Sequence, residues 1–132
     1  MGNVLFAYGT LMFPEVFARV AGPPVLASSP CVLLGWRRHA LRDATYPALV
    51  PCPGKRVQGV CYVEPATGQL QRLDAFEGDE YERVTLQQDG EDLLVYRWRD
   101  DPERLLAADW DVEGFRQTGL PSFQAGFSGW DR

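Results

Sequence analysis

A glutamate on the apolar side of a predicted helix is the residue whose position most directly suggests chemistry. Helical spacing before Gly78 places Leu70, Leu73 and Glu77 within roughly a sixth of a turn of one another. An ionised carboxylate beside leucine side chains is costly, so we expect a raised pKa for Glu77 unless cations or donors compensate. Such a carboxyl group can act as general acid and base near neutral pH. The alternative is a structural pair between this helix-end glutamate and an arginine.

The turn after the first predicted strand is the second candidate element. Residues 3–8 contain the apolar run Val4 to Phe6 and predict a buried strand that ends at Gly9. A Gly-Thr turn at this point can direct successive backbone N–H groups toward a carboxylate or an oxyanion. The same residues also fit an ordinary turn, so this motif alone does not establish a site.

Short helices and strands must position these two elements. We expect one helix from Pro14 to Val20 and a second that is capped by Thr67 and ends at Gly78. Residues 24–41 predict one long strand with a bend at Gly35, or two strands in succession. Further strands are expected at 57–64, 81–88 and 93–99, and the Asp-Gly step at 89–90 predicts a hairpin between the last two.

Three other stretches complete the predicted organisation. Prolines in residues 46–51 favour an extended loop that crosses the sheet, and Tyr46 within it can line a pocket. Gly59 marks a bulge or a place where a ligand or another backbone approaches closely. After Pro102 we expect a helix or a broken helix that turns Leu105, Leu106 and Trp110 toward the core, and then irregular structure. We expect the apolar tail to lie over the domain or against a second copy in a homodimer.

Composition indicates one globular domain over residues 1–132. The chain is 45% hydrophobic and 23% charged, and no segment is long and apolar enough to span a bilayer. The net charge of −5 and the absence of a basic run give no reason to expect binding to nucleic acid or to a membrane surface. The N-terminus has no basic region typical of a signal peptide, so we expect a cytoplasmic protein.

The cysteines and the single histidine mainly exclude other chemistries. Three cysteines without a Cys-x-x-Cys spacing argue against a disulfide framework and a zinc site, so we interpret Cys31, Cys52 and Cys61 as small buried hydrophobic residues. One histidine, His39, rules out a multi-histidine metal site and disfavours a Ser-His-Asp triad. A hydrolase that uses a cysteine with His39 is a weaker alternative. No glycine-rich phosphate loop is present.

Four motifs in the same order resemble the γ-glutamylcyclotransferase superfamily, within it the branch of γ-glutamylamine cyclotransferase and AIG2-like proteins. The resemblance covers roughly the first hundred residues and is less clear after Pro102. The motifs are Phe6-Ala7-Tyr8-Gly9-Thr10-Leu11, Tyr46-Pro47-Ala48, Val57-x-Gly59 and Leu73-Asp74-x-Phe76-Glu77-Gly78-x-x-Tyr81-x-Arg83.

This resemblance implies an α+β fold, with a small mixed β-barrel and short helices packed outside it. It also implies that Glu77 is catalytic and that no metal or organic cofactor is required. The turn would hold the α-amino and carboxylate end of a γ-glutamyl group, while Tyr81 would position Glu77 or the substrate and Arg83 would pair with a nearby carboxylate. The implied substrate-binding residues are Tyr8, Gly9, Thr10, Leu11, Tyr46 and Tyr81.

The implied reaction is the release of 5-oxoproline and a free amine from a γ-glutamyl amide. The α-amine attacks the γ-carbonyl of its own molecule, so proximity supplies much of the acceleration. Glu77 would move the proton as general base and then as general acid. The alternative is a binding or regulatory member of the same fold that keeps the pocket without turnover.

Overall fold

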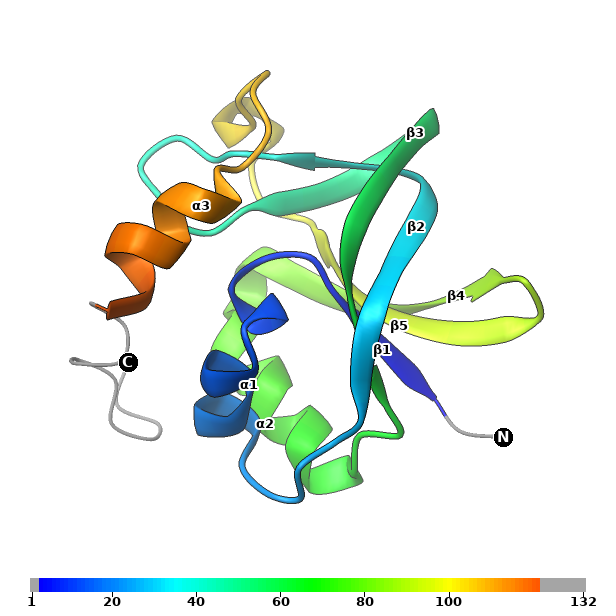
Figure 1. Cartoon of the computed structure of the whole chain (residues 1–132). Helices are drawn as coiled ribbons and strands as arrows, with labels where there is room; N and C mark the ends of the chain where they lie inside the picture. Colours follow the sequence, from blue (N-terminus) through cyan, green and yellow to red (C-terminus); the bar gives the residue numbers. More distant parts are fainter. Residues whose placement is uncertain (1–2, 122–132) are drawn as a thin grey trace.

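A computed structural model describes residues 3–121 as a mixed α+β domain (Figure 1). The apolar tail considered above lies mostly outside the described residues. The main elements are β1 (Val4–Ala7), α1 (Pro14–Ala21), β2 (Ser28–His39), β3 (Ala48–Val63), α2 (Thr67–Glu77), β4 (Tyr81–Gln88), β5 (Glu91–Trp98) and α3 (Val112–Gly114). Shorter turns of helix occupy Thr10–Met12, Gly78–Glu80, Pro102–Arg104 and Phe115–Gly119.

The five strands form one sheet in the order β2-β3-β1-β5-β4. Strand β1 is parallel to β5 and antiparallel to β3, so the sheet is mixed, as predicted. Alternation along β1 buries both of its faces. Leu5 and Ala7 pack in the core that includes α1, whereas Phe6 and Tyr8 pack in a second core with residues of β2, β3 and β5. The turn that follows β1 therefore starts from the best-buried strand of the domain.

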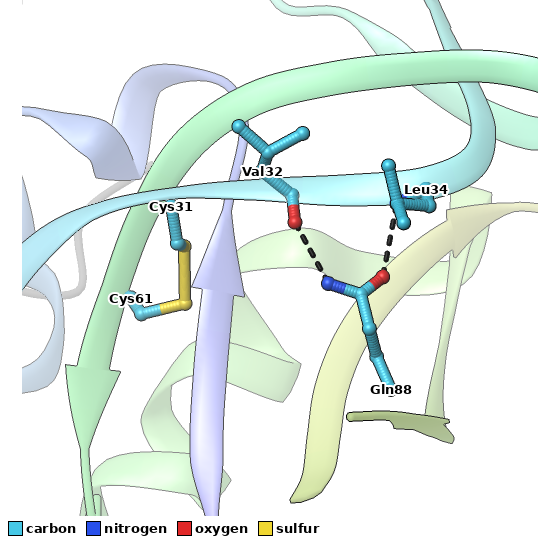
Figure 2. The surroundings of a disulfide bond; sticks show 5 residues. All are labelled: Cys31, Val32, Leu34, Cys61 and Gln88. Carbon is cyan, nitrogen blue, oxygen red and sulfur yellow. Dashed lines mark hydrogen bonds between the residues drawn. A yellow bond between two sulfur atoms is a disulfide. The ribbon is translucent and has the colours of Figure 1, made fainter. Parts of the chain in front are cut away.

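The expected α+β fold is confirmed, but its sheet does not close into the expected β-barrel, because no backbone ladder joins the two edge strands β2 and β4 among the described residues. A side chain bridges them instead (Figure 2). Gln88 Nε2 donates to the carbonyl oxygen of Val32 at 2.8 Å, and Gln88 Oε1 accepts from the N–H of Leu34 at 2.9 Å. One amide side chain thus makes the donor and acceptor pair that another strand would make.

The expectation of three reduced cysteines is also wrong, since Cys31 and Cys61 form a disulfide between β2 and β3 (Figure 2). Their spacing in the sequence carries no signal, but the antiparallel register does. Cys31 lies opposite Gly59 and Cys61 lies opposite Ser29, which makes the two cysteines diagonal neighbours with Cα atoms 6.1 Å apart. Cys52 is a free, half-buried thiol.

Strand β2 is one long strand with an irregularity between Leu34 and Trp36, where Gly35 has a φ of +84°, as the first of the two readings predicted. Strand β3 is longer than expected, because Ala48 to Pro51 belong to it and do not form a loop. The prolines are tolerated there because that half of β3 pairs only with β2, so the opposite edge needs no N–H donor.

Helix α2 ends at Gly78 with a φ of +72°, as predicted, but Thr67 is not its cap. The N-cap is Ala66, and Gln69 Oε1 accepts from the Ala66 N–H at 2.9 Å, so a later side chain supplies the missing acceptor. The hairpin is confirmed, with positive φ at both turn residues, Asp89 and Gly90.

The segment after Pro102 only partly follows the prediction. Trp110 is buried and Leu105 is half-buried, but Leu106 is 41% exposed. Leu105 forms a β-bridge with Leu41 and does not lie in a helix. Residues 112–121 are helical, so the Gly119 step does not interrupt regular structure. Within residues 3–121, no helix is long and apolar enough to cross a membrane.

Candidate active site

Glu77 lies in the wall of two adjoining cavities. It is the last residue of α2 and is half-buried. The outer pocket has a volume of about 490 Å³ and the inner cavity a volume of about 30 Å³. Thr10, Tyr46, Glu77 and Tyr81 line both. The two spaces therefore meet at these four residues, which are here called the neck.

The inner cavity brings together all the site residues that the sequence predicted. Beside the four neck residues, it is lined by Tyr8, Gly9 and Leu11 of the turn. A cavity of this volume holds no more than about two water molecules. The bulk of any ligand must therefore lie in the outer pocket, with only a small group reaching the turn.

The outer pocket also contains residues that the sequence analysis missed. Phe76 adjoins Glu77 in α2, so its position in the helix could have indicated it. The other residues come from loops and from the C-terminal helix, where no periodic pattern signals a pocket. The additional lining residues are Thr45, Phe76, Glu80, Phe115, Thr118 and Gly119.

Hydrogen bonds from the protein interior fix the backbone of the turn. Tyr62 Oη donates to the carbonyl oxygen of Leu11 at 2.7 Å, and Arg38 Nη1 donates to that of Tyr8 at 2.8 Å. The Gly9 carbonyl accepts from the Met12 N–H at 3.0 Å. A Cβ at Gly9 would approach the Pro47 ring within 2.8 Å, so only glycine fits there without a shift.

Two buried tyrosines flank the neck and hold neighbouring backbone. Tyr81 Oη donates to the Pro47 carbonyl at 2.5 Å, and Tyr8 Oη donates to the Tyr96 carbonyl. The Tyr81 hydroxyl therefore fixes the start of β3. Burial raises the pKa of Tyr8, with the nearby Glu77 charge as the next cause. Burial is also the largest cause that raises the pKa of Tyr81, followed by the nearby Tyr8 and Glu77. Both phenols therefore stay neutral at physiological pH.

Glu80 and Arg104 form a polar group at the wall of the outer pocket. Tyr46 Oη donates to Glu80 Oε1 at 2.9 Å, and Arg104 Nη1 contacts Glu80 Oε2 at 2.6 Å. The guanidinium carbon of Arg104 also lies 5.1 Å from the Trp98 ring centroid. The Glu80 carboxylate in the wall of the outer pocket is therefore paired with Arg104 and hydrogen-bonded to Tyr46.

Arg83 pairs with a carboxylate, as predicted. Its Nε lies 3.5 Å from Asp74 Oδ1, which also accepts from Tyr96 Oη at 2.6 Å. These residues lie behind the inner cavity and support Tyr96. Across residues 3–121, no three histidine, cysteine, aspartate or glutamate side chains gather as candidate metal ligands.

Comparison with known protein families identifies the domain. The model of a family described as "Gamma-glutamyl cyclotransferase, AIG2-like" matches residues 5–112. The chain belongs to this family. The matched range includes the whole turn, the helix that carries Glu77 and the β4–β5 hairpin. It ends before Phe115, Thr118 and Gly119, which also line the outer pocket.

Proteins similar to this AIG2-like chain include several from Arabidopsis thaliana. AIG2-like protein C is 35% identical over 128 residues, which cover 90% of this chain and 72% of that protein. Protein AIG2 C is 31% identical over 127 residues, which cover 90% and 75%. A solution structure of an Arabidopsis thaliana protein aligns with a TM-score of 0.68 and 28% identity, over 95% of this chain and 79% of that one.

A solved structure named gamma-glutamyl cyclotransferase has the same fold. It aligns with a TM-score of 0.57 over 98% of this chain and 89% of that one. The sequence identity is 17%, so the likeness concerns the fold alone.

Proposed function

We propose that this AIG2-like protein is a cyclotransferase that converts a γ-glutamyl amide into 5-oxoproline and a free amine. The observation that carries the proposal is that Glu77 lines both the outer pocket and the inner cavity, which the Tyr8–Leu11 turn also lines. Family membership supports the same class of reaction.

The proposed reaction is an intramolecular acyl transfer that consumes no water. The α-amino nitrogen of the glutamyl group attacks its own γ-carbonyl carbon, and a new C–N bond closes a five-membered lactam. The bond from that carbon to the amide nitrogen then breaks, and the amine leaves with a proton. Because nucleophile and carbonyl belong to one molecule, holding the substrate folded removes much of the entropic cost.

In this proposal, Glu77 carries the proton between the two nitrogens. It takes the proton from the α-ammonium group and later delivers it to the leaving nitrogen. Its place at the end of α2 supports the role, because it brings the residue to the wall shared by the two cavities. Tyr8 and Tyr81 stay protonated beside it and so do not compete as bases.

The turn and the outer pocket divide the substrate between them. The backbone N–H groups of Gly9 to Leu11 bind the α-carboxylate or the oxyanion of the tetrahedral intermediate. The hydrogen bonds to the carbonyl oxygens of Tyr8 and Leu11 support this role, because they hold the peptide units in one orientation. The outer pocket, at about 490 Å³, is of ordinary size for a small-molecule site and receives the leaving amine.

The decisive experiment compares the wild type with Glu77→Gln on a panel of γ-glutamyl amides, with 5-oxoproline detected by mass spectrometry. We expect the wild type to release 5-oxoproline and the variant to lose at least about a hundredfold in kcat, since the amide cannot exchange the proton. Glu82→Gln is the matched control, because Glu82 is exposed on β4 and does not line the pocket. Its turnover should equal that of the wild type.

Two results would refute the mechanism or the activity. Full turnover in Glu77→Gln would exclude this glutamate as the proton carrier. A wild type that binds 5-oxoproline or γ-glutamyl amides by calorimetry, yet converts none of the panel, would identify a binding member of the fold.

A further inference from the structure

We propose that Arg38 is a positioning residue for the Tyr8–Leu11 turn and couples it to the segment that completes the outer pocket. The inference rests on the proposed function, because that proposal gives the turn its role in turnover. Arg38 comes from β2 and lies outside every motif that carried the family resemblance. Its side chain is only 10% exposed, which is unusual for an arginine without a specific partner.

The guanidinium group of Arg38 uses three of its nitrogens on two partners. Nη1 donates to the Tyr8 carbonyl oxygen at 2.8 Å. Nε and Nη2 donate to the two carboxylate oxygens of Asp109 at 2.8 and 3.1 Å. This fork geometry suits arginine alone, since a lysine ammonium cannot reach all three acceptors in one plane. The turn is thereby held at a fixed position relative to Asp109.

Asp109 extends the connection to the pocket wall. Its Oδ1 accepts from the N–H of Trp110 at 2.7 Å, and Trp110 Nε1 donates to the Thr45 carbonyl at 2.9 Å. The Trp110 ring centroid lies 5.6 Å from that of Phe115. Thr45 and Phe115 both line the outer pocket. Arg38, Asp109 and Trp110, here called the Arg38 cluster, therefore join the turn to two pocket walls.

The charges of the pair are maintained at neutral pH. Burial alone would raise the pKa of Asp109, but the hydrogen bond and the charge of Arg38 outweigh it, so the pKa is lowered. The pair also contacts the Trp110 ring, with the Arg38 guanidinium carbon 5.8 Å from the centroid. The Arg38 side chain is 10% exposed and that of Asp109 is 62% exposed, so the two parallel hydrogen bonds, and not burial of both partners, give the pair its fixed geometry.

Attachment of the C-terminal segment does not itself require Arg38. The neighbouring Arg37 donates to the Ala107 carbonyl, and His39 Nδ1 contacts the Leu106 carbonyl at 2.7 Å. Ala40 N–H donates to the Ala108 carbonyl at 2.9 Å. These three contacts hold the C-terminal segment and do not involve the turn. Among these neighbouring residues of β2 and its end, within residues 3–121, Arg38 is the one that also bonds to the turn. The difference between Arg37 and Arg38 therefore isolates positioning of the turn from simple tethering.

The test compares Arg38→Met with Arg37→Met, which removes an equal charge from the same strand. Hydrogen exchange of the Gly9 to Met12 amides should be at least about tenfold faster in Arg38→Met and unchanged in Arg37→Met. On the substrate found for the wild type, Arg38→Met should lose about a hundredfold in kcat with a smaller rise in KM. Arg37→Met should keep the wild-type kcat.

The exchange measurement separates this inference from the proposed function. If the wild type turns over no γ-glutamyl amide, the proposed function fails, while faster exchange confined to Arg38→Met still supports positioning. Unchanged exchange in the turn, or equal losses of kcat in both variants, overturns the inference. If Arg38→Met does not fold, Arg38→Lys replaces it, because it keeps the charge and loses the fork; wild-type exchange and kcat in that variant overturn the inference as well.

Discussion

Gly59 illustrates how one residue without a side chain allows the site to form. It lies in β3 beside β1, the strand that leads into the turn. A Cβ built at this position would lie 2.3 Å from the carbonyl oxygen of Ala7 and 2.8 Å from the Phe6 ring. Real Cβ atoms do not approach backbone this closely, so β1 and its turn can occupy their position only while residue 59 is glycine. The predicted close approach at Gly59 is confirmed.

Gly59→Ala should therefore destabilise the protein by about 1–3 kcal/mol, because β1 or β3 must move to admit the methyl group. Urea denaturation monitored by tryptophan fluorescence measures the change in the free energy of unfolding. Gly68→Ala is the control, since a Cβ there meets only the Arg72 guanidinium at 3.7 Å within helix α2. That variant should be neutral or more stable by up to about 1 kcal/mol. Equal stability of Gly59→Ala and the wild type would contradict the clash.

At the scale of elements, the Gln88 side chain connects the two edges of the open sheet. Gln88 is the last residue of β4, and its amide makes two hydrogen bonds to the backbone of β2. Strands β2 and β4 are the two edges of the sheet. The bridge therefore connects two edges that a closed barrel would join by a continuous ladder. It also gives hydrogen-bond partners to the Leu34 N–H and the Val32 carbonyl on the edge strand β2.

Gln88→Ala should lower the free energy of unfolding by about 1–3 kcal/mol, since two hydrogen bonds are lost and the Leu34 N–H and the Val32 carbonyl lose their amide partner. Hydrogen exchange should also become faster at the Leu34 amide. Gln87→Ala is the matched control, because Gln87 is exposed and bonds only to Asp92 within the same hairpin. A loss in Gln87→Ala equal to that in Gln88→Ala would show that the bridge contributes nothing specific.

At the scale of the whole molecule, buried phenols make the fold sensitive to alkaline pH. Four of the five tyrosines, Tyr8, Tyr62, Tyr81 and Tyr96, are at most 6% exposed. Burial is the largest cause that raises the pKa of each one above the ordinary value of 10.0. The folded state therefore keeps these protons at a pH where the unfolded chain has lost them.

The sign of the effect follows from the proton count. Below pH 10 both states hold the phenolic protons, and stability does not depend on them; above it the unfolded state binds fewer, so stability falls as pH rises. The expected slope is about 1.4 kcal/mol per pH unit for each buried phenol. Urea denaturation between pH 9 and 11 measures it, in a Cys52→Ser background that prevents exchange with the Cys31–Cys61 disulfide.

Tyr62→Phe identifies the origin of the slope. Tyr62 lies outside both cavities that meet at Glu77. Its replacement should reduce the dependence of the unfolding free energy on pH above pH 10 by the contribution of one phenol, about 1.4 kcal/mol per pH unit. Its lost hydrogen bond to Leu11 should lower stability equally at all pH values below 10. A slope that is unchanged in Tyr62→Phe would assign the alkaline sensitivity to other groups.

Local patterns in the sequence were sufficient for several elements of the fold. Apolar runs and turn residues specify β1, α1 and the hairpin, because hydrophobic periodicity and the backbone freedom of glycine act over a few residues. Helical spacing also singled out Glu77, whereas the role of the Tyr8–Leu11 turn rested on the family resemblance. All seven predicted site residues line the inner cavity.

Tertiary structure alone decided the features that depend on register and on distant contacts. The Cys31–Cys61 disulfide depends on the register in which β2 pairs with β3. Among the described residues, the sheet is open because its edge strands β2 and β4 do not pair. Residues 48–51 belong to β3 because they pair with β2, although their prolines predict a loop. The Arg38 cluster joins positions about seventy residues apart. Such contacts leave no periodic trace in the sequence, since each depends on where a whole element lies in space.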